Sequence, residues 1–206
     1  MTVEHVEFLV EEPSMEAALR VLLPRVLSPV SFAIYPSQCK HELLKRLPER
    51  LRGYASWLPN SWRIVVLLDR DDDNCVRLRT RVDLMAEEAG LRVRKDASRR
   101  WQVVNRLAIE ELEAWYFGDW QAVRAAYARV PESTPRKKRF RNPDAIRGGT
   151  WEALEQVLRR AGYFRAGLRK IEAARTIAEH MDLDRNSSSS FRAFGAVLRE
   201  ITGTRR

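Results

Sequence analysis

Alternating apolar and polar segments predict that strands and helices follow one another along this chain. His5 to Val10 reads as a strand, and residues 13–24 as a helix that Pro24 ends. A second strand is expected over Val30 to Tyr35 and a second helix over Lys40 to Trp57. Strands that alternate with helices are typical of an α/β fold with a mainly parallel sheet flanked by helices.

The most apolar of the predicted strands, Val65 to Leu68, runs directly into acidic residues, Asp69 to Asp73. Four branched apolar residues in succession predict a strand buried on both faces. Its carboxylates then lie at the C-terminal end of a strand, where open α/β sheets bind ligands. If the backbone stays extended, the side chains of Asp69 and Asp71 point the same way, and two such carboxylates suit Mg²⁺.

The same acidic run also fits a solvated turn. Asp73 or Asn74 would then cap the helix that the pattern predicts from about Asn74 to Ala89, with Gly90 closing it. Acids also follow the first strand, as Glu11-Glu12, so a carboxylate again stands where a strand hands over to a helix.

A third group of acids stands among apolar residues between Ile109 and Asp119, after short candidate strands at 91–94 and 102–104. On a helix, Glu110 and Glu113 are three residues apart and share a face, so one of them can reach the crevice at Asp69. An exposed acidic face near a helix N-terminus, favoured by the helix dipole, explains the pattern equally well.

A basic loop is predicted over residues 129–150, where proline, glycine and basic residues replace the apolar pattern. The loop is a linker between a core at 1–128 and a C-terminal helical region at 151–206, which is expected to pack on the core. The loop contains Arg136, Lys137, Lys138, Arg139 and Arg141 around Phe140. These residues suit a phosphate backbone with one base stacked on Phe140, although a solvated charge run has the same composition. Helical patterns follow at 151–161, 168–180 and 191–201, the last with serine caps.

The net charge of the chain indicates what kind of partner it binds. The 206 residues include 37 Lys and Arg against 28 Asp and Glu, a formal net charge of +9. Such a chain attracts acidic polymers, and nucleic acid is the first candidate, with DNA expected before RNA. The alternative is that the excess of basic residues only keeps the protein soluble.

Cys39 and Cys75 have no metal-binding spacing and are expected to be free thiols. The absence of a long apolar run and the acidic N-terminal stretch predict a cytoplasmic protein with no membrane contact.

Four segments carry a likeness to a known family: Val10-Glu11-Glu12-Pro13-Ser14, Asp69-Arg70-Asp71, Glu110-Glu111-Leu112-Glu113-Ala114-Trp115 with Gly118-Asp119 behind it, and Ser189-Ser190-Phe191-Arg192-Ala193-Phe194. Together they resemble the TOPRIM domain of topoisomerases, bacterial primases and OLD-family nucleases, and more specifically the DUF4276 family of TOPRIM-like proteins. The segments span nearly the whole chain. One position departs from the family pattern, because Glu12 stands where glycine is usual and the close approach of glycine to a phosphate is lost.

The resemblance implies a metal-dependent nuclease that hydrolyses phosphodiesters. Asp69 and Asp71 would hold Mg²⁺ or Mn²⁺, and Glu11 would be a further ligand or a general acid/base. Glu113, and with it Glu110, would complete the site. The likeness also implies an ATPase partner, with this chain as the effector of a bacterial antiphage defence pair.

Two other interpretations compete with the nuclease. A non-catalytic nucleic-acid-binding or ATPase-docking subunit would keep the acids as remnants, and both Glu12 and the basic loop favour it. A haloacid-dehalogenase-like phosphatase also places Asp-x-Asp after a strand. That family carries the motif on its first strand with Thr or Val two places on, whereas the motif here follows a later strand and Asp73 occupies that place.

Overall fold

A four-stranded parallel sheet lies at the centre of the molecule in a computed structural model that describes residues 2–95 and 100–204. Its strands are β1 (His5–Val10), β2 (Ser31–Pro36), β3 (Trp62–Asp69) and β4 (Val103–Ala108). They pair in the order β2-β1-β3-β4, and every pairing is parallel. The predicted α/β architecture with a parallel sheet is therefore confirmed.

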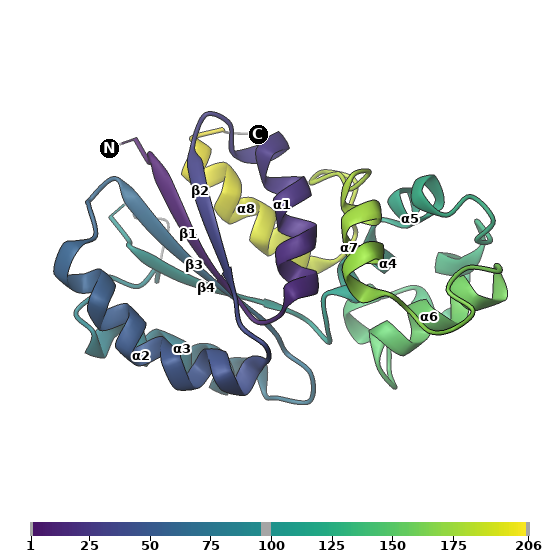
Figure 1. Cartoon of the computed structure of the whole chain (residues 1–206), viewed down its shortest axis with the longest axis horizontal. Helices are drawn as coiled ribbons and strands as arrows, with labels where there is room; N and C mark the ends of the chain where they lie inside the picture. Colours follow the sequence, from purple (N-terminus) through teal and green to yellow (C-terminus); the bar gives the residue numbers. More distant parts are fainter. Residues whose placement is uncertain (1, 96–99, 205–206) are drawn as a thin grey trace.

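Helices cover both faces of this sheet (Figure 1). They are α1 (Pro13–Leu27) and α8 (Ser189–Thr202) on one face, and α2 (Lys40–Trp57) and α3 (Cys75–Glu88) on the other. Successive residues of β3 alternate between two hydrophobic cores: Val65 and Leu67 pack in the core under α1 and α8, and Val66 and Leu68 in the core under α2 and α3. Burial on both faces explains why β3 is apolar throughout.

A smaller group of helices lies beside the sheet (Figure 1). It contains α4 (Glu113–Gly118), α5 (Trp120–Ala126), α6 (Thr150–Arg160) and α7 (Lys170–Ala178), with three short 3-10 turns between α5 and α6, η1 (Thr134–Arg136), η2 (Lys138–Phe140) and η3 (Pro143–Ala145). The hydrophobic core under α1 and α8 continues into this group without a break. Arg25 near the end of α1 also donates hydrogen bonds to the carbonyl oxygens of Ala178, Glu179 and Met181.

One helix prediction differs from the structure at a proline, and one strand prediction differs in its length. Helix α1 continues past Pro24 to Leu27, because Leu23 and Leu27 are both fully buried and extend the apolar stripe of the helix. The expected strand at 91–94 is reduced to a single bridge between Val93 and Val103. The predicted cap of α3 is correct, since the Asn74 side chain accepts hydrogen bonds from two backbone N–H groups at the start of that helix.

Within the described ranges, no helix has both the length and the apolar character that crossing a membrane requires. The thiols of Cys39 and Cys75 are not joined in a disulfide.

Candidate functional site

The C-terminal ends of all four strands meet at one edge of the sheet, because every pairing is parallel. The chain leaves β1 toward β2 through α1 on one face, and it leaves β3 toward β4 through α3 on the other face. The gap between the ends of β1 and β3 is therefore the topological switch point of the sheet. Glu11 follows β1 and Asp69 ends β3, so the two predicted carboxylates stand on either side of this point.

Glu11 lies with its carboxylate against the end of β3. Its Oε2 atom accepts a hydrogen bond from the backbone N–H of Asp69 at 2.9 Å, and only 8% of the residue is exposed. Burial raises the pKa of Glu11 from 4.5 to about 7, against the opposing effects of that hydrogen bond and of Lys40. This carboxyl group can therefore hold or release a proton near neutral pH.

The carboxyl group of Asp69 is enclosed and incompletely bonded. Asp69 is 6% exposed, and among the described residues its buried Oδ1 atom has no hydrogen-bond partner. Burial raises the pKa of Asp69 well above its usual range, and the charges of Glu11 and Glu113 add to the effect. A buried carboxylate oxygen without a partner is costly unless a cation or a proton satisfies it.

Glu113, in the first turn of α4, is a third buried carboxyl group, and its charge acts on Asp69. It is 2% exposed, and its Oε2 atom also lacks a partner. Burial raises the pKa of Glu113 from 4.5 to about 8, and the charges of Glu12 and Glu111 contribute to the increase. One turn along α4, the buried hydroxyl of Tyr116 has no partner either. The third group of acids thus reaches the Asp69 crevice through Glu113.

Glu110 does not share a helix face with Glu113, contrary to the sequence prediction. Helix α4 begins only at Glu113, and Glu110 precedes it with φ of 62° and forms an ion pair with Arg70. Glu111 is used structurally, because its Oε2 atom accepts hydrogen bonds from Thr150 and Trp151 at the start of α6.

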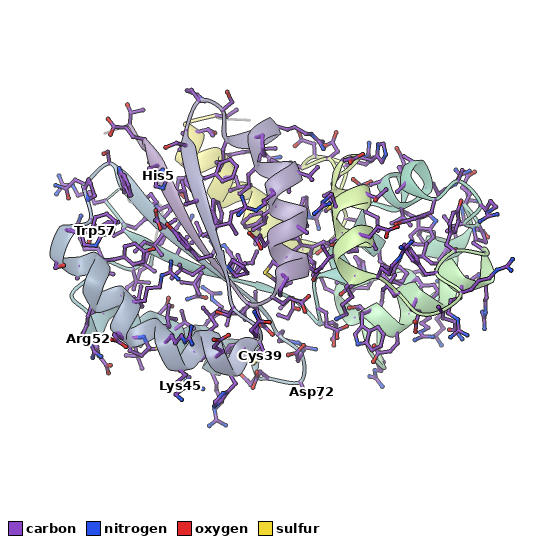
Figure 2. The ribbon with its side chains drawn as sticks, viewed as in Figure 1. His5, Cys39, Lys45, Arg52, Trp57 and Asp72 are labelled. Atoms are coloured by element: carbon purple, nitrogen blue, oxygen red, sulfur yellow. The ribbon has the colours of Figure 1, made fainter. Side chains whose placement is uncertain are left out.

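The backbone at Asp71 is not extended, contrary to the sequence prediction. Strand β3 ends at Asp69, and Asp71 has φ of 48°, in the left-handed region. Its carboxylate is half exposed and lies 2.7 Å from the ammonium of Lys40, which also contacts Asp73 at 2.9 Å. Figure 2 shows the neighbouring Asp72 at the same end of the molecule as Cys39, which precedes α2. Lys40 therefore neutralises the charges of Asp71 and Asp73, the outer carboxylates of the acidic run.

Sequence reasoning missed two charged residues of this site. Glu12 was treated only as a lost glycine, yet its charge raises the pKa of Glu11, Asp69 and Glu113. Lys170, the first residue of α7, was not singled out, although carboxylates of the site raise its pKa. The adjacent acids at the end of β1 were a signal for Glu12, whereas no local signal pointed to Lys170.

The donor set fits a hard divalent cation. The orphaned oxygens of Asp69 and Glu113 are buried and negatively charged when deprotonated, and Mg²⁺ needs only one or two protein carboxylates beside water and substrate phosphate. Among the residues for which the structure gives positions, no group of three or more Asp, Glu, His or Cys side chains is arranged to hold a metal ion, so a cation here would rest on two carboxylates, water and substrate.

The basic run lies on the outside of the small helical group. Lys137, Lys138, Arg139 and Arg141 are exposed, as expected of residues that bind an extended polyanion. Phe140, in contrast, is 7% exposed and stacks on Phe117 with 5.0 Å between the ring centroids. The predicted stacking of a base on Phe140 is therefore wrong, because the ring is part of the hydrophobic core.

The last two family segments support the fold around the site. Asp119 caps α5 and forms a buried ion pair with Arg185, and a Cβ atom at Gly118 would overlap with Asn186 Oδ1. Ser190 accepts a hydrogen bond at 3.0 Å from the indole of Trp115, which lies two residues after Glu113. These contacts tie α4, and with it Glu113, to the start of α8.

Comparison with known proteins gives a family but no described relative. Searches of curated proteins and of solved structures both found no match. The model of one family, described as a domain of unknown function (DUF4276), matches residues 10–199. Since that range includes every element from the end of β1 to most of α8, this chain belongs to the DUF4276 family.

Proposed function

We propose that this protein is a metal-dependent nuclease of the TOPRIM type, which hydrolyses phosphodiester bonds at the crevice between β1 and β3. The observation that carries the proposal is the pair of buried oxygens without partners, Asp69 Oδ1 and Glu113 Oε2, at the switch point of a parallel sheet. Folding places Asp69 beside Glu11, and the charges of Glu11 and Glu113 both act on its carboxyl group despite the mutual repulsion, which favours a role that needs concentrated negative charge.

Each carboxyl group has its own part in this reaction. Asp69 and Glu113 would hold Mg²⁺ or Mn²⁺, which when bound polarises a phosphate oxygen and lowers the pKa of a coordinated water. Glu11, whose pKa lies at about 7, is suited to exchange a proton with the attacking water or the leaving oxygen. The oxygen of water forms a bond to phosphorus while the bond to one nucleotide oxygen breaks, so no side-chain nucleophile is required.

Nucleic acid is the proposed substrate because of the charge distribution of the chain. The formal net charge is +9, and the exposed basic run from Arg136 to Arg141 can follow a phosphate backbone. We propose DNA before RNA as the polymer.

One observation favours a second function. Lys40 pairs with both Asp71 and Asp73, so the second carboxylate of the Asp-x-Asp motif is already neutralised. A nucleic-acid-binding subunit, or one that docks on an ATPase, would tolerate this arrangement because it does not need a cation at Asp71.

A cleavage assay distinguishes the two functions. Labelled DNA and RNA are incubated with the wild type in Mn²⁺ or in chelator, and with Asp69→Asn, Asp71→Asn and Glu113→Gln. We expect Mn²⁺-dependent cleavage that the Asp69 and Glu113 substitutions abolish. Glu16→Gln, at an exposed ion pair on α1, is the control and should cleave like the wild type.

The Asp71→Asn variant shows whether the exposed carboxylate of Asp71 takes part in cleavage together with the buried carboxylates of Asp69 and Glu113. Full loss in Asp71→Asn would mean that Lys40 releases this carboxylate when the metal binds. Binding of nucleic acid by the wild type in Mn²⁺ without cleavage would instead support the docking subunit.

A further inference from the structure

Helices α1 and α7 lie side by side and run in the same direction (Figure 1). Arg25 in the last turn of α1 bonds to carbonyl oxygens at the end of α7, which fixes the C-terminal ends of the two helices together. Their N-terminal ends therefore face the same way, toward the sheet edge where Glu12 precedes α1. Lys170 is the first residue of α7, and helical side chains tilt toward the helix N-terminus, so its ammonium extends toward the acids of the site.

A lysine is electrostatically misplaced at this position. The N-terminus of a helix carries partial positive charge, which favours acids and disfavours a cation in the first turn. Burial would also lower the pKa of Lys170, yet the charges of Glu113, Glu12, Glu111 and Asp69 together raise it above its usual value. The charges of the acids therefore outweigh the effect of burial on the Lys170 ammonium.

Lys170 also has unused hydrogen-bonding capacity. Among the residues that the structure describes, its ammonium forms neither a hydrogen bond nor an ion pair, and it lies 5.1 Å from the ring centroid of Trp151. Lys40, on the other side of the crevice, is fully engaged with Asp71, Asp73 and the carbonyl oxygen of Arg70. Of these two lysines, only Lys170 can donate to a phosphate without breaking a contact of the protein.

We infer that Lys170 is the second cation of the site: its ammonium takes the place of a second metal ion beside Glu12 and Glu113 and donates hydrogen bonds to a non-bridging oxygen of the substrate phosphate. The inference rests on the proposed nuclease function and narrows it to hydrolysis with one divalent ion per chain. Two-metal enzymes use the second ion to neutralise charge that develops on the transferred phosphate, and a fixed ammonium supplies the same kind of stabilisation.

Counting bound Mn²⁺ tests this inference independently of activity. Free Mn²⁺ is followed by electron paramagnetic resonance as it is titrated into the wild type, Lys170→Met and Lys170→Arg. We expect one ion per chain in the wild type and in Lys170→Arg, which keeps the positive charge, and two ions in Lys170→Met. Lys45→Met is the matched control, because Lys45 is an exposed lysine on α2 (Figure 2) and its removal should leave one ion.

Cleavage gives the second measurement. At a Mn²⁺ concentration that fills only the first site, Lys170→Met should lower kcat about 10²-fold or more, as removal of a donor to developing negative charge does, while Lys45→Met is unchanged. Circular dichroism establishes that each variant is folded, and Lys170→Gln, which retains a polar side chain, replaces Lys170→Met if that variant is not.

The outcomes separate this inference from the proposed function. Two ions in the wild type, or a single ion in both Lys170→Met and Lys170→Gln, would overturn the role of Lys170 and leave the nuclease standing. No Mn²⁺ bound to the wild type would overturn both.

Discussion

The carboxylate of Glu11 accepts a hydrogen bond from the backbone N–H of Asp69, with 2.9 Å between Oε2 and the nitrogen. This contact joins the ends of the two central strands and places both acids at one point. We expect Glu11→Gln to keep the contact, because the amide oxygen also accepts, and to keep the stabilisation by Mn²⁺, because Asp69 and Glu113 are the proposed ligands. Glu11→Ala leaves the N–H group buried without a partner and should cost about 1–3 kcal/mol of unfolding free energy. Thermal unfolding with chelator and with Mn²⁺ measures both effects. Loss of the Mn²⁺ stabilisation in Glu11→Gln would instead make Glu11 a metal ligand.

The stability of the metal-free protein should fall as the pH rises through the neutral range. The pKa of Glu113 is about 8 in the folded protein against 4.5 for an ordinary glutamate. Between these values the unfolded chain has lost the proton while the folded protein retains it, so a rise in pH favours unfolding. Glu11, with a pKa of about 7, acts in the same direction.

Melting temperature against pH in chelator tests this dependence. Glu113→Gln should flatten the curve and melt higher than the wild type at the alkaline end, because glutamine has no charge to bury. A wild-type melting temperature that rises between pH 4.5 and about 8 would contradict the burial of these acids in their protonated form.

The basic run should determine how salt affects nucleic-acid binding. Each phosphate contact contributes about 0.9 to the slope of log affinity against log salt on duplex DNA. Replacement of Arg136, Lys137, Lys138 and Arg139 by alanine should therefore flatten the slope by up to about three units, as measured by fluorescence anisotropy. Replacement of Lys45 and Arg52 on α2 (Figure 2) is the control for loss of charge elsewhere, and an equal effect per residue would show that binding is not localised to the loop.

Phe140 should affect stability and not the salt dependence of binding. The ring is buried and stacked on Phe117, so Phe140→Ala leaves a cavity in the core and should cost about 3–5 kcal/mol. Chemical denaturation measures this cost. A variant as stable as the wild type that binds single-stranded DNA more weakly would restore the base-stacking role.

Asp119 should prove structural although it belongs to the family segment around Glu113. Its carboxylate is 1% exposed, lies 2.7 Å from Arg185 Nε and caps α5. Asp119→Ala removes this ion pair and the α5 cap and should lower stability by about 1–3 kcal/mol, less than for a fully buried pair because the Arg185 side chain is 34% exposed and still bonds to the His180 carbonyl oxygen, whereas the number of Mn²⁺ ions bound by the folded variant stays the same. Loss of Mn²⁺ binding with unchanged stability would place Asp119 in the metal site instead.

The sheet and its central acids could be predicted from the sequence for a local reason. An uninterrupted apolar run such as Val65 to Leu68 has to be buried on both sides, which requires a parallel sheet with helices on each face. A carboxylate directly after such a run lies at the sheet edge whatever the rest of the chain does. For that reason Glu11 and Asp69 were identified before any tertiary contact was known.

Predictions that assumed regular backbone beyond an element were less successful. Asp71 and Glu110 both adopt the left-handed region, so neither extended nor helical spacing describes their side chains. The basic neighbours of Phe140 favour a ring available to stack on a base, whereas the ring packs on Phe117 in the core.

What the sequence determined by itself is the fold class and the two acids that end β1 and β3, because burial and strand direction are encoded in consecutive residues. Only the tertiary structure decided which further charges join them. Glu113 and Lys170 come from helices far along the chain, and their position depends on how α4 and α7 pack beside α1. The electrostatic potential at a site depends on every charged group that packing brings near it. A local sequence pattern does not show which distant residues these are.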